Sequence, residues 1–244
     1  MPRPELILIH GAFSRPAHLA AWVARFERDG FRCRTPALPG HEPPDAEALS
    51  TLDMPDYLRF LRAEVETCPS PPVLIGHSMG GLLAQQVASV VPCRALVCVA
   101  SAPPWMLSPP AGSLPWFAPM LPRVLLGRPL QASPSALRRR VLQDLPAAEQ
   151  EAIIKTIGQE SGKAFRTMAL GRARLPAQRF AGQVFCISGD EDGVIPDRTS
   201  STIARFYAAR HMRLPGHGHW LIAGSRADEV AGAVSGWLTT VAPA

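Results

Sequence analysis

Lysine is nearly absent from this chain of 244 residues: only Lys155 and Lys163 occur, and arginine carries the rest of the positive charge. The formal net charge is +5, and the arginines are scattered apart from one cluster at residues 138–140. A nucleic-acid-binding surface requires a basic stripe, often with aromatic residues interleaved, and neither is present. We therefore interpret the cluster as a solvated helix face and expect no nucleic-acid partner.

Recognisable metal and cofactor patterns are also missing. The five cysteines form no Cys-x-x-Cys pair, and an odd number without metal-binding spacing predicts reduced, mostly buried thiols. The sequence has no His-x-x-x-His motif, no EF-hand spacing, and no Gly-x-Gly-x-x-Gly after a strand. We accordingly expect no metal and no cofactor.

No apolar run approaches the roughly 20 residues that a membrane-spanning helix needs. The first core strand begins by Glu5, which leaves no room for a secretory signal peptide. These observations predict a cytoplasmic protein without stable membrane insertion. No pattern in the sequence points to a particular oligomeric state.

What the chain does contain is an alternation of strand and helix patterns, with a hydrophobic content of 47% that suffices for one α/β domain. The predicted strands are residues 5–10, 31–35, 72–75, 95–100, 183–188 and 211–214. The predicted helices between and after them are residues 16–29, 55–67, 79–91, 198–208 and about 221–240, and residues 43–53 are a predicted loop. Such alternation favours a mostly parallel sheet of six strands flanked by helices.

The pattern changes at Pro103, because ten prolines fall between residues 103 and 146 and no strand pattern survives there. Helical patterns remain at residues 113–126, 134–145, 147–160 and 162–171. We interpret residues 103–178 as a helical cap, or lid, inserted into a core domain made of residues 1–102 and 179–244.

The strand at residues 72–75 leads into a Gly-x-Ser-x-Gly pentapeptide with Ser78 at its centre, and a helix pattern follows. A serine at a tight turn between strand and helix is the context of a nucleophile elbow. Gly76 and Gly80 leave room for the strand and the helix to approach each other. Ser78 is therefore the candidate nucleophile, and the N–H groups of the following helix point toward developing negative charge.

Further motifs stand in an informative order. A buried strand ends at His10-Gly11, an acidic turn at residues 190–192 follows a later strand, and Gly218-His219 comes near the end. Serine, acid and histidine in that order, together with the elbow, resemble the serine hydrolases of the α/β-hydrolase fold, an esterase- and lipase-like family. The resemblance covers nearly the whole chain and implies that fold with a Ser-Asp-His triad.

The resemblance also implies roles for individual residues. It favours His219 as the base that activates Ser78, and His217 remains the alternative two residues away. The family pattern places the acid three residues after the glycine that ends the strand, which gives Asp192, with Asp190 as the alternative. The acid holds the imidazole in the right tautomer and stabilises its charged form.

An oxyanion hole needs two backbone N–H groups rather than particular side chains. Met79 follows the nucleophile and is expected to supply one; the resemblance implies Ala12 for the other, with Phe13 as the alternative. The large apolar side chains of the cap must be buried somewhere, so we expect them to roof a pocket above the serine. The expected substrate-binding residues are Phe13, Trp105, Met106, Trp116, Phe117 and Met120.

The expected activity is hydrolysis of a small-molecule carboxylic ester, with a medium-chain or aromatic acyl group, through an acyl-enzyme. The same site also suits a thioesterase, a lactonase, an acyltransferase or a hydrolase of carbon–carbon bonds. A non-catalytic protein that uses the hydrolase pocket for binding is the alternative from another class.

Overall fold

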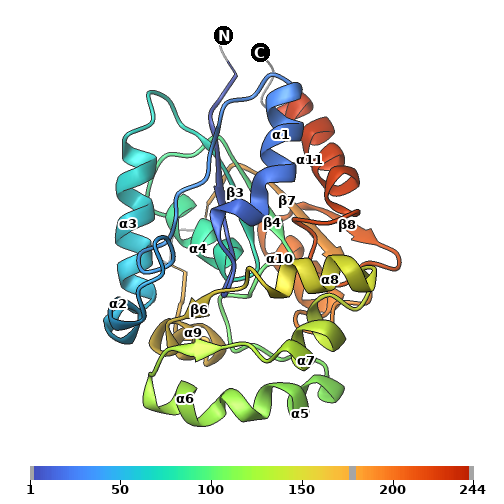
Figure 1. Ribbon diagram of the computed structural model, residues 1–244. Helices are drawn as coiled ribbons and strands as arrows, with labels where there is room; N and C mark the ends of the chain where they lie inside the picture. The colour runs from blue at the N-terminus through green and yellow to red at the C-terminus, as the bar shows by residue number, and fades with distance from the viewer. Residues whose placement is uncertain (1–2, 176–179, 242–244) are drawn as a thin grey trace.

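A parallel sheet of six strands forms the centre of the computed structural model, which describes residues 3–175 and 180–241 (Figure 1). The strands follow one another in space in the order β2-β1-β3-β4-β7-β8, and every neighbouring pair is parallel, as the sequence predicts. Their bounds are Leu6–Ile9 (β1), Cys33–Arg34 (β2), Val73–His77 (β3), Ala95–Val99 (β4), Gln183–Gly189 (β7) and Arg210–Leu214 (β8).

Helices cover both faces of this sheet. Side chains of β1 alternate between two buried clusters, with Leu6 and Leu8 on one face and Ile7 and Ile9 on the other. The first face packs against α1 (Ala20–Arg28) and α11 (Ala227–Val241). The second packs against α3 (Met54–Glu66), α4 (Met79–Ala88) and α10 (Asp197–Tyr207). A strand buried on both sides is apolar throughout, which explains the uninterrupted run of β1.

The segment between β4 and β7 lies at one end of the sheet, with α5 and α6 farthest from the strands (Figure 1). Its elements are α5 (Leu114–Phe117), α6 (Leu121–Leu126), β5 (Leu130–Gln131), α7 (Pro134–Ala136), α8 (Ala147–Ile154), β6 (Gln159–Glu160) and α9 (Gly162–Ala169). The predicted boundary between cap and core, at residues 178 and 179, lies outside the described residues.

This segment is not purely helical, so the prediction of no strands within it is wrong. Strands β5 and β6 pair antiparallel, with Leu130 opposite Glu160 and Gln131 opposite Gln159. Each strand has two residues, which is too short for an alternating pattern to show in the sequence. Pro129 directly precedes β5, a position at which its missing N–H interrupts no ladder.

The helix predicted over residues 113–126 is broken into short turns. A single turn of 3₁₀ helix, Ala118–Met120, separates α5 from α6. Pro115, Pro119 and Pro122 each fall in the first turn of a new piece. Proline has no N–H to donate to a preceding turn, so it begins helices more readily than it continues them.

Two other boundaries differ from the sequence prediction. The loop predicted at residues 43–53 contains α2 (Ala46–Thr51), because the Asp45 side chain caps it by accepting the Ala48 N–H at 2.9 Å. The last helix begins at Ala227 rather than near 221. Gly224, with a φ of +82°, belongs to the loop before it, and this loop carries His219.

Candidate active site

Ser78 stands at the turn from β3 to α4 in a backbone conformation that side chains rarely adopt, with φ 55° and ψ −119°. Its N–H donates to the Val99 carbonyl at 3.0 Å, and its own carbonyl accepts from the N–H groups of Gly81 at 3.0 Å and Ala102 at 2.9 Å. Strain of this kind persists only where the surroundings fix it. Here these hydrogen bonds, with a longer one from the Leu82 N–H to the Ser78 carbonyl at 3.4 Å, hold the serine at the tip of the turn.

The glycines around the serine are required by close backbone contacts. A Cβ atom on Gly76 would lie 2.2 Å from the Gly80 carbonyl oxygen, and one on Gly80 would lie 2.3 Å from the Ile9 carbonyl oxygen. A Cβ on Gly11 would approach the Ser78 Cβ to 2.9 Å. The end of β1 and the start of α4 are therefore in direct contact around the serine.

His219 bridges Ser78 and Asp192. Its Nε2 atom lies 3.1 Å from the serine Oγ, and its Nδ1 atom lies 2.7 Å from the Asp192 Oδ2 atom. The histidine is 5% exposed and the aspartate 4%. Because a carboxylate can only accept, Nδ1 carries the proton and Nε2 is free to accept the serine hydroxyl. This is the arrangement in which a serine can be deprotonated as it attacks.

The two candidate acids have different partners. The Oδ1 atom of Asp192 accepts the N–H groups of Val194 at 2.7 Å and Ile195 at 2.8 Å, which leaves Oδ2 for the imidazole. Asp190 instead pairs with Arg213, at 3.2 Å. The structure therefore brings Asp192, and not Asp190, to the histidine.

The neighbouring histidines serve the loop rather than the serine. His217 donates from Nδ1 to the Pro215 carbonyl at 2.9 Å, and its Nε2 lies 3.5 Å from a Glu229 carboxylate oxygen. His77 donates from Nε2 to the His219 carbonyl at 2.9 Å. Burial, reinforced by the neighbouring His219, lowers the pKa of His77 to about 3, so it remains neutral and fixes the loop backbone.

His10 has a similar role beside the serine. Its Nε2 accepts the Leu38 N–H at 3.2 Å, so its proton is on Nδ1, which donates to the Gly11 carbonyl at 3.0 Å. Burial, followed by the charge of His41, lowers the pKa of His10 to about 3. A neutral His10 therefore fixes the peptide group that precedes Ala12.

Two backbone N–H groups beside Ser78 are suited to bind an anion. Met79 is the first residue of α4, where an N–H has no acceptor within its own helix. Within the part of the chain that the structure describes, no protein acceptor takes the Ala12 N–H. Met79 directly follows Ser78, and Ala12 follows Gly11, whose backbone lies close to the Ser78 side chain.

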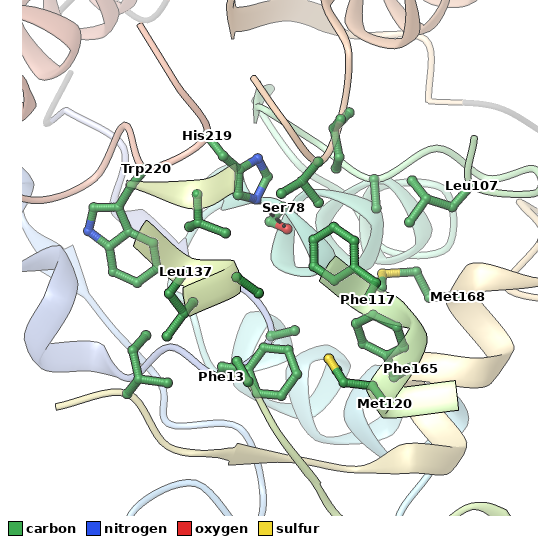
Figure 2. A pocket seen from close by; sticks show the side chains of 18 of the residues that line it. Phe13, Ser78, Leu107, Phe117, Met120, Leu137, Phe165, Met168, His219 and Trp220 are labelled. Carbon is green, nitrogen blue, oxygen red and sulfur yellow. Dashed lines mark hydrogen bonds between the residues drawn. The ribbon is translucent and has the colours of Figure 1, made fainter. Parts of the chain in front are cut away.

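An apolar cavity opens beside the Ser78 hydroxyl, with about 740 Å³ of empty space when its mouth is included. Figure 2 shows aromatic rings of Phe117, Phe165 and Trp220 among the side chains that surround it. Residues of the inserted segment make up much of the wall, together with loops of the core. They are Leu107, Phe117, Met120, Ala132, Ala136, Leu137, Val141, Ile157, Phe165 and Met168.

Only some of the side chains expected to bind substrate lie in this cavity. Phe13, Phe117 and Met120 line it. Trp105 and Met106 are 36% and 64% exposed and are not part of its wall. Trp116 lies in a separate surface hollow with the Arg139 guanidinium 5.2 Å from its ring centre. Consecutive residues on a helix point about 100° apart, and of this pair only Phe117 lines the cavity.

The wall also includes residues that the sequence analysis did not select. Phe165 and Met168 lie three positions apart on α9 and face the cavity together, while Trp220 directly follows His219. The spacing of the pair within the predicted helix 162–171 is the signal that could have identified them. Trp105 and Trp116, which the sequence analysis predicted instead, are larger but do not line this cavity.

Neither a metal site nor a membrane span is found in residues 3–175 and 180–241. No three His, Cys, Asp or Glu side chains in these ranges are placed to hold a metal ion together. None of the described helices is long and apolar enough to cross a membrane.

A model of the alpha/beta hydrolase family matches residues 6–233, and the chain belongs to that family.

The chain is also similar to individual proteins, to different extents. A pyrethroid hydrolase from Sphingobium wenxiniae is 40% identical over 77 residues, a match that spans 32% of this chain but only 28% of the relative's own length. The magnesium-chelatase 30 kDa subunit of Rhodobacter capsulatus is 27% identical over 251 residues, covering 96% of this chain and 87% of that protein. The crystal structure of the Paleococcus ferrophilus monoacylglycerol lipase is similar with a TM-score of 0.76 at 20% identity, covering 99% of this chain and 97% of that one, which supports the fold alone.

Proposed function

We propose that the protein is a serine hydrolase that cleaves carboxylic esters through an acyl-enzyme. The observation that carries the proposal is the chain of contacts from the Asp192 carboxylate through His219 to the Ser78 hydroxyl, with distances of 2.7 and 3.1 Å. The name of the pyrethroid hydrolase that is similar to this chain over 77 residues supports the same reaction class.

In the first half of the reaction Ser78 attacks the ester carbonyl while His219 takes its proton. The N–H groups of Met79 and Ala12 stabilise the oxyanion of the tetrahedral intermediate. His219 then gives its proton to the leaving alcohol, and Asp192 stabilises the imidazolium throughout. The products of this half are the free alcohol and an ester of Ser78.

In the second half water replaces the alcohol. His219 removes a proton from the water, which attacks the acyl carbonyl, and the same two N–H groups stabilise the second oxyanion. Collapse of the intermediate returns the proton to Ser78 and releases the carboxylic acid. No metal or cofactor is needed to balance either half.

The acyl group is expected to be medium-length or aromatic, because side chains from residues 107–168, within the proposed cap, line the cavity beside Ser78. The wall beside Ser78 is almost wholly apolar, and Phe117 and Phe165 offer flat surfaces to a ring or a chain. Each buried CH₂ contributes up to about 0.8 kcal/mol, so such acyl groups gain more than acetate does.

A fluorophosphonate probe tests the proposal directly, since it reacts only with an activated serine. We expect stoichiometric labelling of the wild-type protein, loss of labelling in Ser78→Ala, and hydrolysis of p-nitrophenyl butyrate by the wild type alone. A wild-type protein that is folded but neither labels nor hydrolyses any ester in a panel of graded acyl length contradicts the proposal and favours a binding role.

A further inference from the structure

One short stretch of the segment between β4 and β7, residues 156–161, which we call the strap, forms hydrogen bonds with the loop beside Ser78 and with the turn that follows it. It connects α8 to α9 and contains β6. His18 donates from Nε2 to the Thr156 hydroxyl oxygen at 2.8 Å, and Gly158 donates its N–H to the Phe13 carbonyl at 2.9 Å. Phe13 directly follows Ala12, so the strap holds the loop that carries one of the two proposed oxyanion donors.

The strap also places a fully buried carboxylate beneath that loop. Glu160 has no exposed surface. Its Oε2 atom lies 3.1 Å from Nε2 of His41, and its Oε1 atom accepts the Tyr57 hydroxyl at 2.8 Å and the Ser161 N–H at 2.6 Å. Burial, followed by the nearby Glu160 charge, raises the pKa of Tyr57, so its hydroxyl stays protonated and donates.

His41 lies between the Pro39 carbonyl and the Glu160 carboxylate, an arrangement that favours its protonated form. Its Nδ1 atom lies 3.2 Å from the Pro39 carbonyl, which can only accept, so Nδ1 carries a proton. Its Nε2 faces a carboxylate whose other oxygen already accepts two hydrogen bonds. Burial alone lowers the pKa of His41, but the hydrogen bond and charge of Glu160 outweigh it and raise the pKa above its usual value.

His10 connects the pair of His41 and Glu160 to the loop that carries Ala12. The ring centres of His41 and His10 lie 5.0 Å apart, and His10 binds the carbonyl of Gly11, the residue before Ala12. Groups facing His41 thus come from three elements: Glu160 from β6, His10 from the end of β1, and Tyr57 from α3.

Stability alone is a weak explanation for this pair. Burying two charges costs solvation that their attraction only partly repays, and a well-packed apolar pair is often as stable. A salt bridge does, however, fix the relative position of the groups that it joins, and catalysis by an oxyanion hole is sensitive to small displacements of its donors.

We propose that Glu160 is a positioning residue: through His41 and His10 it fixes the loop that presents the Ala12 N–H to the oxyanion. The inference rests on the proposed esterase function and extends it to a residue of the inserted segment. The oxyanion exists only in the transition state and intermediates. A substitution of Glu160 should therefore lower kcat and leave KM nearly unchanged.

The test compares Glu160→Gln with Tyr57→Phe in the full-length protein. Glu160→Gln keeps the shape of the side chain but removes the charge that holds His41, whereas Tyr57→Phe removes one donor to Glu160 and leaves the pair intact. With p-nitrophenyl butyrate we expect kcat to fall tenfold or more in Glu160→Gln with KM within twofold of wild type, and to stay within twofold in Tyr57→Phe.

Affinity for a trifluoromethyl ketone supplies the second readout, because its adduct with Ser78 places an oxyanion in the same hole. Glu160→Gln should weaken inhibition in parallel with kcat, and Tyr57→Phe should not. If Glu160→Gln does not fold, Glu160→Asp replaces it as the test variant, because it keeps the charge on a side chain one methylene shorter. We expect kcat of Glu160→Asp to be at least threefold below that of the wild type.

The outcomes are distinct. An active wild-type enzyme whose Glu160 variants melt at a lower temperature but keep kcat and inhibitor affinity assigns Glu160 a purely structural role and overturns the proposal. A Tyr57→Phe variant that loses as much kcat as Glu160→Gln also overturns it, because the loss then follows general damage to the buried cluster. A wild-type protein without esterase activity removes the proposed function and this inference together.

Discussion

His219 is tied to the strand that leads into Ser78 by its backbone as well as by its side chain. Its Nε2 lies 3.1 Å from the Ser78 Oγ, and its carbonyl accepts the Nε2 proton of His77, the residue before the serine, at 2.9 Å. The serine and the loop that carries the histidine are therefore fixed to each other by two contacts. Such preorganisation is what a base needs to meet a proton in a fixed geometry.

Ser78→Ala, His219→Ala and Asp192→Asn should each reduce kcat by about 10⁴–10⁶-fold, because the members of a triad act as a unit. The two larger losses are expected for the serine and histidine variants. Steady-state hydrolysis of p-nitrophenyl butyrate, with circular dichroism to verify folding, measures the effect.

Asp190→Asn and His217→Gln are the matched controls, since each residue lies within two positions of a triad member and binds elsewhere. Both should remain within about threefold of wild type. Full activity in Asp192→Asn together with its loss in Asp190→Asn would assign the acid to the other carboxylate.

The parts of the site that could be predicted are those whose chemistry is concentrated in short motifs. Ser78 is marked by the glycines on either side, because strand and helix must touch there. Four of the six parallel strands, β1, β3, β4 and β7, are buried, mostly apolar runs long enough to show their pattern between helices.

The remaining parts depend on contacts between distant residues. Glu160 pairs with His41 across 119 positions, and β6 is only two residues long, so no local pattern marks either. Trp116 and Phe117 are equally apolar in sequence, yet only Phe117 faces the cavity. Their orientation is set by three prolines that divide one predicted helix into several short pieces.

A second prediction concerns the elbow glycines. Gly80→Ala should destabilise the fold by about 3 kcal/mol, because its Cβ would overlap the Ile9 carbonyl oxygen, which belongs to a central strand and cannot move aside easily. Gly236→Ala is the control: nothing lies within 4 Å of its Cβ on α11, so alanine should stabilise by about 0.5–1 kcal/mol. Urea unfolding measures both, and equal effects at the two sites would contradict the packing argument.

A third prediction concerns the stability of the fold at acidic pH. Burial is the largest cause that lowers the pKa of His10 and His77 to about 3 and that of His18 to about 4, from 6.5. Below pH 6.5 the unfolded chain therefore binds protons that the folded chain does not. The free energy of unfolding consequently decreases as the pH is lowered. Each histidine contributes about 1.4 kcal/mol per pH unit.

His41 has the opposite sign, because its raised pKa contributes stability that is present below pH 6.5 and lost as pH rises through the folded value. The three histidines with a lowered pKa outnumber it. The urea concentration at the unfolding midpoint should therefore fall steeply as the pH is lowered from 6.5 to 4. His18→Gln should reduce the slope of the free energy of unfolding against pH by about 1.4 kcal/mol per pH unit. A slope that this variant leaves unchanged would show that His18 is not one of the groups responsible.

The final prediction separates two adjacent aromatic residues. Phe117 lines the cavity beside Ser78, whereas Trp116 packs under Arg139 on the surface. Wild-type kcat/KM should rise with acyl length from acetate to hexanoate, by up to about fourfold for each CH₂ that the cavity buries.

Phe117→Ala should lower the hexanoate-to-acetate ratio by about tenfold while acetate hydrolysis stays within about threefold, since the triad is untouched. Trp116→Ala, a larger truncation one residue away, should leave the ratio unchanged. The reverse result, with selectivity lost in Trp116→Ala and kept in Phe117→Ala, would place the acyl chain in the outer hollow instead of the cavity beside the serine.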